Sequence, residues 1–269
     1  KPNSFKLGYN TNSWGATPIL DEMFSNIAKA GWKGVELISL SLDWLGTSNH
    51  LSEKLKKNGL VLSSMFGRID DIGSDSNIML EREKRRIEYG AELGAEVYAF
   101  TGPKRPLNRK PNQDEFKRFS EHIQILIEYA VVFGQTLAFH AHPASLAETE
   151  QEQDILFSYV PQLQICLDVS ISALMGEDPV CQLKKYSNRL AYVHLKDVDH
   201  GKFCVMGRGI GLIDFMKVKN SLIDIGYDGW VVGELGSGAD TGAVDSCNAL
   251  LKTCQGLSTF IHIPFKLKR

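Results

Sequence analysis

The chain has 269 residues, 43% of them hydrophobic and 23% charged, which is the composition of an ordinary soluble protein rather than a disordered or membrane-spanning one. Its formal net charge of −2, from 30 Lys and Arg against 32 Asp and Glu, argues against a nucleic-acid partner, since such proteins usually carry a basic stripe. No run approaches the roughly 18 apolar residues needed to cross a bilayer, so we expect no membrane partner.

Eight short apolar runs, each with the length of a buried strand, recur along the chain. Between them lie segments with helical periodicity, such as the one that carries Phe116, Phe119 and Ile123. Near-continuous apolar strands that alternate with helices indicate a parallel sheet covered on its faces. In chain order the predicted strands are 5–10, 34–38, 60–66, 96–101, 136–141, 163–169, 190–196 and 230–235.

A glycine stands between a predicted helix and the next strand at five junctions, where the left-handed helix cap favours it. Eight strand–helix units in about 250 residues fit a closed (β/α)₈ TIM barrel. We therefore predict one α/β barrel domain over 1–269, with a short C-terminal tail from about 258. A doubly wound open sheet is the structural alternative, but no GxGxxG motif follows the first strand. The five glycines are Gly31, Gly59, Gly94, Gly134 and Gly226.

Polar side chains gather at the predicted strand ends. In (β/α)₈ barrels the active site lies where the carboxyl ends of the strands meet. A histidine, an aspartate and a glutamate on neighbouring strands can hold one divalent ion, and we predict Mn²⁺, Zn²⁺, Co²⁺ or Mg²⁺. The residues at these ends are Tyr9, Asn10, Asn12, Glu36, Phe66, Arg68, His140, His142, Asp168, His194, Lys196, Asp197 and Glu234.

Several of these residues also have a purely structural interpretation. An aspartate that ends a strand often caps the following helix, and Asp168 is placed to do so. Glu36 is suited to a helix cap or to supporting a ligand, and Lys196 to a buried ion pair with Asp197 or Glu234. The joint position of these groups at one end of the predicted barrel favours a metal site.

The strand ends belong to longer motifs, namely GWKGVEL (31–37), LAFHAHPASLAET (137–149), LDVSISALMGEDP (167–179), YVHLKDVD (192–199) and MGRGIGLIDF…GYDGWVVGEL (206–235). Together they resemble the xylose-isomerase-like TIM barrel superfamily of sugar isomerases, epimerases and inosose dehydratases. The resemblance covers nearly the whole chain. HLKD, followed by a glycine-rich turn and GYDGW-x-x-x-E, is its most specific combination. It implies a metal-binding isomerase or lyase of carbohydrate metabolism.

The resemblance implies metal ligands from the fifth to the eighth strand, which fall on His142, Asp168, His194 and Glu234. In the sugar epimerases the fifth-strand ligand is a glutamate, and two glutamates pass a proton on opposite faces of the substrate. This chain has FHAHP there, which resembles the inosose-dehydratase-like branch. After the sixth strand the family commonly has D-T-G-H. This chain has DVSI, and its Ile171 cannot bind metal or a hydroxyl.

The predicted chemistry passes through an enediolate of a small sugar or keto-polyol that is stabilised by the divalent ion. Glu234 is the first candidate for the catalytic base, with Glu148 or His140 on the opposite side of the substrate. Lys196 is expected to neutralise the developing oxyanion or to hold a hydroxyl. Reprotonation gives isomerisation or epimerisation, and loss of a β-hydroxyl gives dehydration. The HxH segment favours dehydration without excluding the other two.

The remaining predicted contacts concern the substrate. His200 is a candidate for the contact that Ile171 cannot make. Arg208, within MGRGIG, suits either an anionic group or a flexible turn. The predicted substrate-binding set is Asn10, Trp14, Glu36, Phe66, Arg68, His200 and Arg208, of which the two aromatic residues also fit packing positions.

Two other function classes stay open. A non-catalytic carbohydrate-binding barrel is suggested by Ile171. Apurinic endonucleases share the superfamily, but their trinuclear zinc site needs more His and Glu ligands, and a DNA groove favours positive charge. Metal content separates the three classes, because the endonuclease binds several zinc ions, the enzyme one ion and the binder none. Relatives in the superfamily also suggest a homo-oligomer.

The cysteines form no CxxC pair and no regular spacing, which favours reduced and mostly buried thiols. The first residues, KPNSFKLGYN, lack the apolar stretch of a signal peptide. These features predict a cytoplasmic protein. The cysteines are Cys166, Cys181, Cys204, Cys247 and Cys254.

Overall fold

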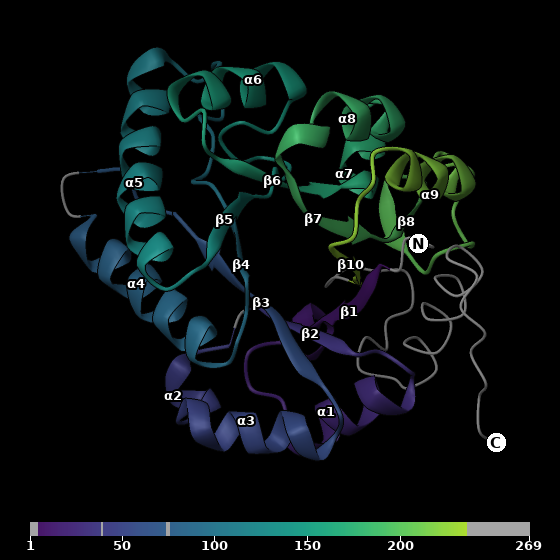
Figure 1. The fold of residues 1–269 in the computed structure, drawn as a ribbon. Coiled ribbons are helices and arrows are strands. Elements are labelled where there is room, and N and C mark those ends of the chain that lie inside the picture. Colours follow the sequence, from purple (N-terminus) through teal and green to yellow (C-terminus); the bar gives the residue numbers. More distant parts are fainter. Residues whose placement is uncertain (1–4, 39, 74–75, 236–269) are drawn as a thin grey trace.

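The computed structural model describes residues 5–38, 40–73 and 76–235. Within them, eight parallel strands close into a barrel in the order β1-β10-β7-β6-β5-β4-β3-β2 (Figure 1). Each strand overlaps a predicted one, so the (β/α)₈ prediction is confirmed. The barrel strands are β1 (Lys6–Asn10), β2 (Gly34–Leu37), β3 (Val61–Arg68), β4 (Val97–Thr101), β5 (Thr136–Phe139), β6 (Gln164–Asp168), β7 (Leu190–Leu195) and β10 (Trp230–Gly233).

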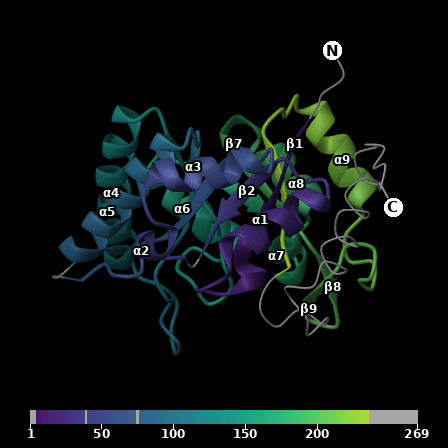
Figure 2. The ribbon, with the colours of Figure 1, turned by 90° about the horizontal axis from the view of Figure 1, so that it is seen from below.

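Helices surround the barrel, with α4 and α5 on one side and α9 on the opposite side (Figure 2). Their apolar faces pack on the outer face of the sheet, and α5 begins with a capping box between Asn112 and Glu115. The helices are α1 (Leu20–Lys29), α2 (Leu42–Leu45), α3 (Ser48–Lys57), α4 (Asn77–Glu92), α5 (Gln113–Val132), α6 (Glu150–Tyr159), α7 (Val169–Leu174), α8 (Pro179–Lys185), α9 (Phe215–Asp224) and the 3₁₀ turns η1 (Thr11–Trp14) and η2 (Ser187–Arg189).

The five predicted junction glycines all adopt a positive φ, from 64° at Gly59 to 100° at Gly31. This left-handed conformation ends each helix and turns the chain back toward the barrel, and side chains other than glycine adopt it only at a cost. The five junctions therefore fix the register of helix and strand along the chain.

The inside of the barrel is filled by its own layer of buried side chains, which lies beneath the strand ends. Cys166 is part of this layer, and Cys204 is also buried, as predicted, whereas Cys181 is exposed. The other two cysteines lie outside the described residues. The layer contains Phe66, Val97, Ala99, Ala138, Cys166, Tyr192, Trp230 and Val232.

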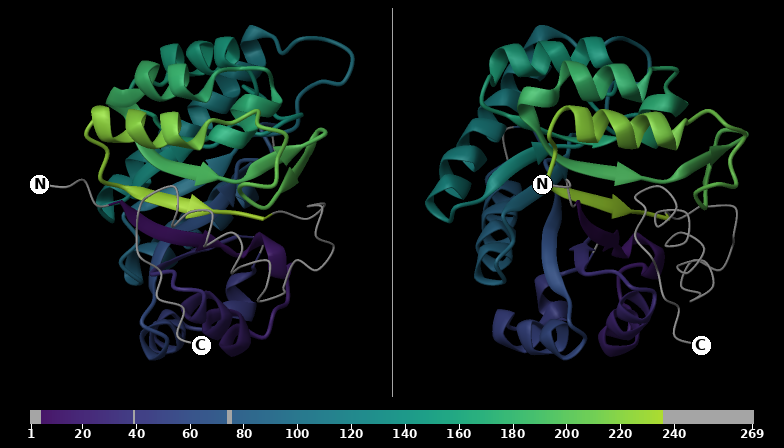
Figure 3. Two further views of the ribbon diagram at one scale, coloured as in Figure 1. Left: turned by 90° about the vertical axis from the view of Figure 1, so that its right-hand side faces the viewer. Right: turned by 45° about the vertical axis from the view of Figure 1, so that its right-hand side comes forward.

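An antiparallel hairpin of β8 (Asp197–Asp199) and β9 (Lys202–Cys204) follows β7 and was not predicted. It projects past the carboxyl ends of β7 and β10 (Figure 3). The Asp197 carboxylate accepts hydrogen bonds from the backbone N–H groups of Val198, Gly207 and Gly209. The hairpin is therefore tied to the segment that follows it.

No helix of the described segments is long and apolar enough to cross a membrane. The predicted C-terminal tail, from about residue 258, lies outside these segments.

Candidate functional site

Four predicted site residues meet at the carboxyl end of the barrel. His140 follows β5, Asp168 ends β6, His194 lies near the end of β7, and Glu234 follows β10. Parallel registration places Asp168 beside His194 across β6 and β7. All four are buried, with at most 8% of any of them exposed. The barrel topology thus brings together groups that lie far apart in the sequence.

Asp168, His194 and Glu234 each contribute one donor atom, and the three atoms lie within 4.8 Å of one another. The Nδ1 atom of His194 is 3.5 Å from Glu234 Oε2 and 4.0 Å from Asp168 Oδ2. One imidazole nitrogen and two carboxylates form a mixed donor set that suits several divalent ions. We call these three residues the carboxylate site.

The two oxygens of Asp168 have separate roles. Oδ1 accepts hydrogen bonds from the N–H groups of Ser170 at 2.9 Å and Ile171 at 3.0 Å, and so caps α7. Oδ2 lies 3.4 Å from His140 Nε2 and accepts a hydrogen bond from Lys196 Nζ. Burial alone raises the pKa of Asp168, but the charge of Lys196 and the contact with His140 hold that pKa far below its ordinary value. The predicted cap is present, and it leaves one oxygen for the site.

Lys196 is 3% exposed, and its ammonium lies between the two carboxylates of the site. It donates to Glu234 Oε2 at 2.6 Å as well as to Asp168. The ammonium also lies 4.6 Å from the centre of the Phe203 ring in β9. Burial alone lowers the pKa of Lys196, but the two carboxylates raise it above 10.5. The predicted ion pair with Glu234 is therefore present, while Asp197 instead binds the backbone after the hairpin.

Glu234 receives a second hydrogen bond. Its Oε1 accepts from Asn12 Nδ2 at 3.2 Å, while Oε2 faces Lys196. Burial raises the pKa of Glu234, yet the charges of Lys196 and His194 bring that pKa below 4.5. The carboxylate is consequently ionised near neutral pH and able to accept a proton or to bind a cation.

Glu36 and Asn10 lie on the Nε2 side of His194, and Glu36 contacts that nitrogen. Glu36 Oε2 lies 2.8 Å from His194 Nε2 and accepts a hydrogen bond from Asn10 Nδ2. Both supporting residues are fully buried. A carboxylate on one imidazole nitrogen fixes the ring, so that the other nitrogen faces the ligand. Burial alone lowers the pKa of His194, but Cys166 and Glu36 raise it well above 6.5.

Phe66 contacts the histidine rings and also lines a cavity of about 490 Å³. Its ring meets the His140 ring edge-on at 5.3 Å and stacks on the His194 ring at 6.1 Å. Arg68, Arg82, Arg86 and Ile38 line the same cavity. Its volume is in the range of small-ligand sites. Phe66 and Arg68, both predicted to bind substrate, therefore line one cavity.

Other predicted site residues lie apart from this group. His142 is exposed, and its Nδ1 lies 2.9 Å from the carbonyl oxygen of Pro143. Glu148 forms an ion pair with Arg105 and accepts a hydrogen bond from Ala144 N–H at 2.6 Å. The structure brings His140, rather than His142, to Asp168, and it gives Glu148 a partner outside the carboxylate site.

Three substrate-binding candidates have their contacts with residues outside the carboxylate site. His200 occupies the turn of the hairpin with a φ of 45°, and its exposed ring lies 2.6 Å from Asp199 Oδ1. Arg208 is exposed, and its backbone N–H binds the carbonyl of Val205. Trp14 packs edge-on against Tyr9 at 5.9 Å, in agreement with the packing interpretation.

From the sequence, Cys166 was interpreted as an ordinary core residue, and its position beside two histidine rings was not predicted. The Cys166 thiol lies close to the rings of His140 and His194. Residues two apart on a strand face the same side. Cys166 precedes Asp168 by two positions on one strand, so the sequence could have predicted that both side chains face the same side.

The donor set fits a divalent ion on its chemistry. All donor atoms are buried, and neither ring nitrogen of His140 or His194 has a hydrogen-bond partner of good geometry. Buried polar atoms of this kind usually have partners, and a bound ion or ligand is one way to supply them.

The model of the xylose isomerase-like TIM barrel family matches residues 24–253. The chain is 29% identical over 272 residues to the rhizopine catabolism protein MocC of Rhizobium meliloti, covering 86% of this chain and 81% of that protein. It is 27% identical over 278 residues to the inosose dehydratase of Geobacillus kaustophilus (strain HTA426), covering 86% of this chain and 87% of that enzyme.

Solved structures share the architecture. L-ribulose 3-epimerase superposes with a TM-score of 0.81 at 18% identity, over 96% of this chain and 95% of that chain. The IOLI protein with a binding zinc atom gives a TM-score of 0.79, also at 18% identity, over 97% of this chain and 100% of that chain. At this identity the likeness shows a common barrel fold.

Proposed function

Since the chain belongs to the xylose isomerase-like TIM barrel family, we propose that it is an enzyme that removes a proton beside the carbonyl of a small sugar or keto-polyol. The proposal includes one divalent ion, Mn²⁺, Zn²⁺, Co²⁺ or Mg²⁺, held by Asp168, His194 and Glu234. The single observation that carries the proposal is the convergence of these buried donors within 4.8 Å at the carboxyl end of the barrel.

When bound, the ion supplies Lewis-acid stabilisation of the negative charge that develops on the substrate oxygen. The chain supplies the proton transfers. Glu234 is ionised near neutral pH and is the first candidate for the base. Burial lowers the pKa of the His140 imidazole below 6.5, so this ring is neutral and able to accept a proton from another direction. Glu148 is less suited, because its carboxylate already binds Arg105.

Lys196 is positioned to stabilise an oxyanion of the substrate. Its ammonium is buried and within hydrogen-bond distance of both carboxylates of the site. When an ion takes up those carboxylates, the ammonium is available for a substrate oxygen. Phe66 packs against both rings of the imidazole pair, and Arg68 in the neighbouring cavity is available to a substrate hydroxyl or anionic group.

Among the reactions that start from an enediolate, we propose dehydration of a keto-inositol first. The inosose dehydratase of Geobacillus kaustophilus aligns over 86% of this chain. The HxH segment after β5 agrees with that branch. The likeness to L-ribulose 3-epimerase concerns the fold, so it adds no comparable support for epimerisation.

The test is metal analysis of the purified protein by mass spectrometry, combined with a substrate screen. We expect about one divalent ion per chain, reduced in Glu234→Gln and retained in Glu148→Gln, whose carboxylate lies outside the carboxylate site. Keto-inositols and ketoses are then screened in D₂O for proton exchange and for loss of water. If no ion is taken up on titration with Mn²⁺, Co²⁺ or Zn²⁺, the proposal is wrong and a carbohydrate-binding barrel becomes the better interpretation.

A further inference from the structure

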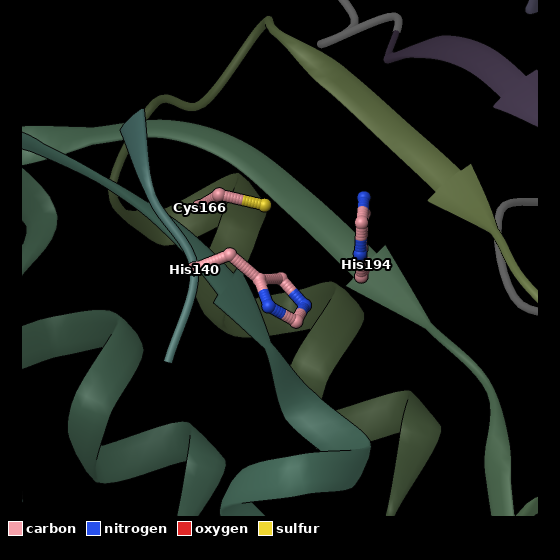
Figure 4. A group of neighbouring side chains, drawn as sticks. All are labelled: His140, Cys166 and His194. Atoms are coloured by element: carbon pink, nitrogen blue, oxygen red, sulfur yellow. The ribbon is translucent and has the colours of Figure 1, made fainter. Parts of the chain in front are cut away.

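A thiol and two imidazoles converge inside the barrel, just beneath the carboxylate site. His140 follows β5, Cys166 lies in the middle of the neighbouring β6, and His194 lies in the next strand, β7; Figure 4 shows the Cys166 and His140 side chains directed toward His194. One donor atom from each lies within 4.8 Å of the others. At most 3% of any of the three residues is exposed. The group therefore has the dimensions of a site for a single ion.

The imidazole nitrogens of this group lack ordinary partners. Neither Nδ1 nor Nε2 of His140 has a hydrogen bond of good geometry, although Nε2 lies 3.4 Å from Asp168. The contacts of His194 with carboxylates are likewise charge contacts outside hydrogen-bond geometry. Leaving buried polar atoms unsatisfied costs free energy. A ligand between the rings and the thiol would supply the partners.

The local charges separate this group from the carboxylate site. Lys196 lies against both Asp168 and Glu234, so an ion bound to the two carboxylates has to displace an ammonium. An ion held by the thiol and the two imidazoles leaves the Lys196 ammonium on its two carboxylates. Thiolate sulfur also selects ions such as Zn²⁺ and Cd²⁺ over Mg²⁺ and Mn²⁺, which favour oxygen.

We propose that His140, Cys166 and His194 form a second metal site that takes a thiophilic divalent ion, Zn²⁺ or Cd²⁺. As the ion binds, the Cys166 thiol and any protonated imidazole of the site lose their protons to solvent, and no oxidation is involved. Three protein ligands leave a fourth position of a tetrahedral ion open to water. Both sites use His194, so the two ions exclude each other. This exclusion rests on the proposed function, whereas the second site itself does not.

The experiment titrates the metal-free full chain with Co²⁺ and then Cd²⁺, and records the ultraviolet charge-transfer absorbance of metal thiolates. The variants are Cys166→Ser and, as a matched control, Cys181→Ser, whose thiol is exposed on α8. We expect a band that saturates at one ion per chain in the wild type and in Cys181→Ser, and no band in Cys166→Ser. Cd²⁺ affinity should fall at least about tenfold in Cys166→Ser, since disturbing even a supporting partner of a ligand costs about that much.

A wild type that binds Co²⁺ without a thiolate band overturns the proposal, and so does a band that persists in Cys166→Ser. If circular dichroism shows that Cys166→Ser does not fold, X-ray absorption of the zinc-loaded wild type decides. A sulfur neighbour at about 2.3 Å supports the site, and a shell of only nitrogen and oxygen overturns it.

Mn²⁺ binding separates this inference from the proposed function. A thiolate band in the wild type, together with no uptake of Mn²⁺, Co²⁺, Zn²⁺ or Mg²⁺ by Cys166→Ser, keeps the second site and contradicts the carboxylate site. Mn²⁺ uptake without any thiolate band in the wild type keeps the carboxylate site and contradicts the second site. Mn²⁺ affinity that is unchanged in Cys166→Ser, together with release of Mn²⁺ from the wild type in step with the growth of the Cd²⁺ thiolate band, supports both sites and their exclusion.

Discussion

The ammonium nitrogen of Lys196 lies 2.6 Å from Oε2 of Glu234, with both side chains buried at the end of the barrel. Because the same ammonium also contacts Asp168, one protein cation offsets part of the negative charge of both carboxylates. A divalent ion on these carboxylates performs the same electrostatic task. The Lys196 ammonium and the ion are therefore expected to compete for the two carboxylates, and this competition can be measured.

Replacing Lys196 by Met leaves two buried carboxylates without their cation. Breaking a buried ion pair by removing one partner typically costs about 3–5 kcal/mol, so we expect a loss of that order in the unfolding free energy of the metal-free protein. Mn²⁺ should then stabilise Lys196→Met more than the wild type, because nothing has to be displaced. Urea unfolding with and without Mn²⁺ measures both effects, and Lys202→Met, exposed on β9, is the control. Equal stabilisation of variant and wild type would show that ammonium and ion do not share this space.

Glu36→Gln is expected to weaken metal binding without touching a ligand. The Glu36 carboxylate lies 2.8 Å from His194 Nε2, and loss of such a supporting group typically costs about 10–100-fold in metal affinity. Equilibrium titration with Mn²⁺ provides the measurement, and Asp43→Asn, at an exposed position of α2, should keep the affinity of the wild type. An unchanged affinity in Glu36→Gln would mean that packing alone orients the His194 ring.

Glu115 is expected to make stability dependent on pH in the acid range. Its hydrogen bond with Arg109, together with the contact to Asn112 at the start of α5, lowers the pKa of Glu115 from 4.5 to about 2. Because the folded pKa is depressed, this stabilisation is present above about pH 4.5 and is lost as the pH falls toward 2. Glu115→Gln should lower Tm at pH 6 and flatten the decline of Tm between these values. Glu121→Gln, exposed on the same helix, is the control, and an unchanged acid slope in Glu115→Gln would contradict the assignment.

Restoring the family histidine at position 171 is expected to cost stability. Ile171 is 3% exposed and packs in α7 directly after the Asp168 cap. A polar ring in this buried position loses its contact with water and does not have the shape of the branched aliphatic side chain, and burying such a group typically costs about 1–3 kcal/mol. Thermal unfolding of Ile171→His and of the milder Ile171→Val should show the larger loss in the histidine variant. A histidine variant as stable as the wild type would indicate that the site has room for the ring.

The sequence predicted the barrel well because the physical signals are local. Strands buried on both faces are continuous apolar runs, and a left-handed helix cap favours glycine. The hairpin over 197–204 escaped prediction because its stability comes from the Asp197 carboxylate and the backbone of Gly207 and Gly209, a contact between separate turns.

The sequence predicted only part of the candidate site, because it could not choose between two histidines near the end of the fifth strand. His140 and His142 share strand parity, but β5 ends at Phe139, and the turn beyond it carries His142 to the surface. Alternation within a strand gives no information about where the strand stops, so parity could not choose between the two histidines.

Phe203 gives the hairpin a part in the electrostatics of the barrel end. Its ring lies 4.6 Å from the Lys196 ammonium, and an aromatic face stabilises a cation without neutralising it. If the Lys196 ammonium leaves the carboxylates, it can therefore keep its contact with the Phe203 ring on β9. The rate of amide hydrogen exchange along β8 and β9 should consequently change when a divalent ion binds to the carboxylates. A hairpin at the rim of the barrel would then be sensitive to ion binding inside it.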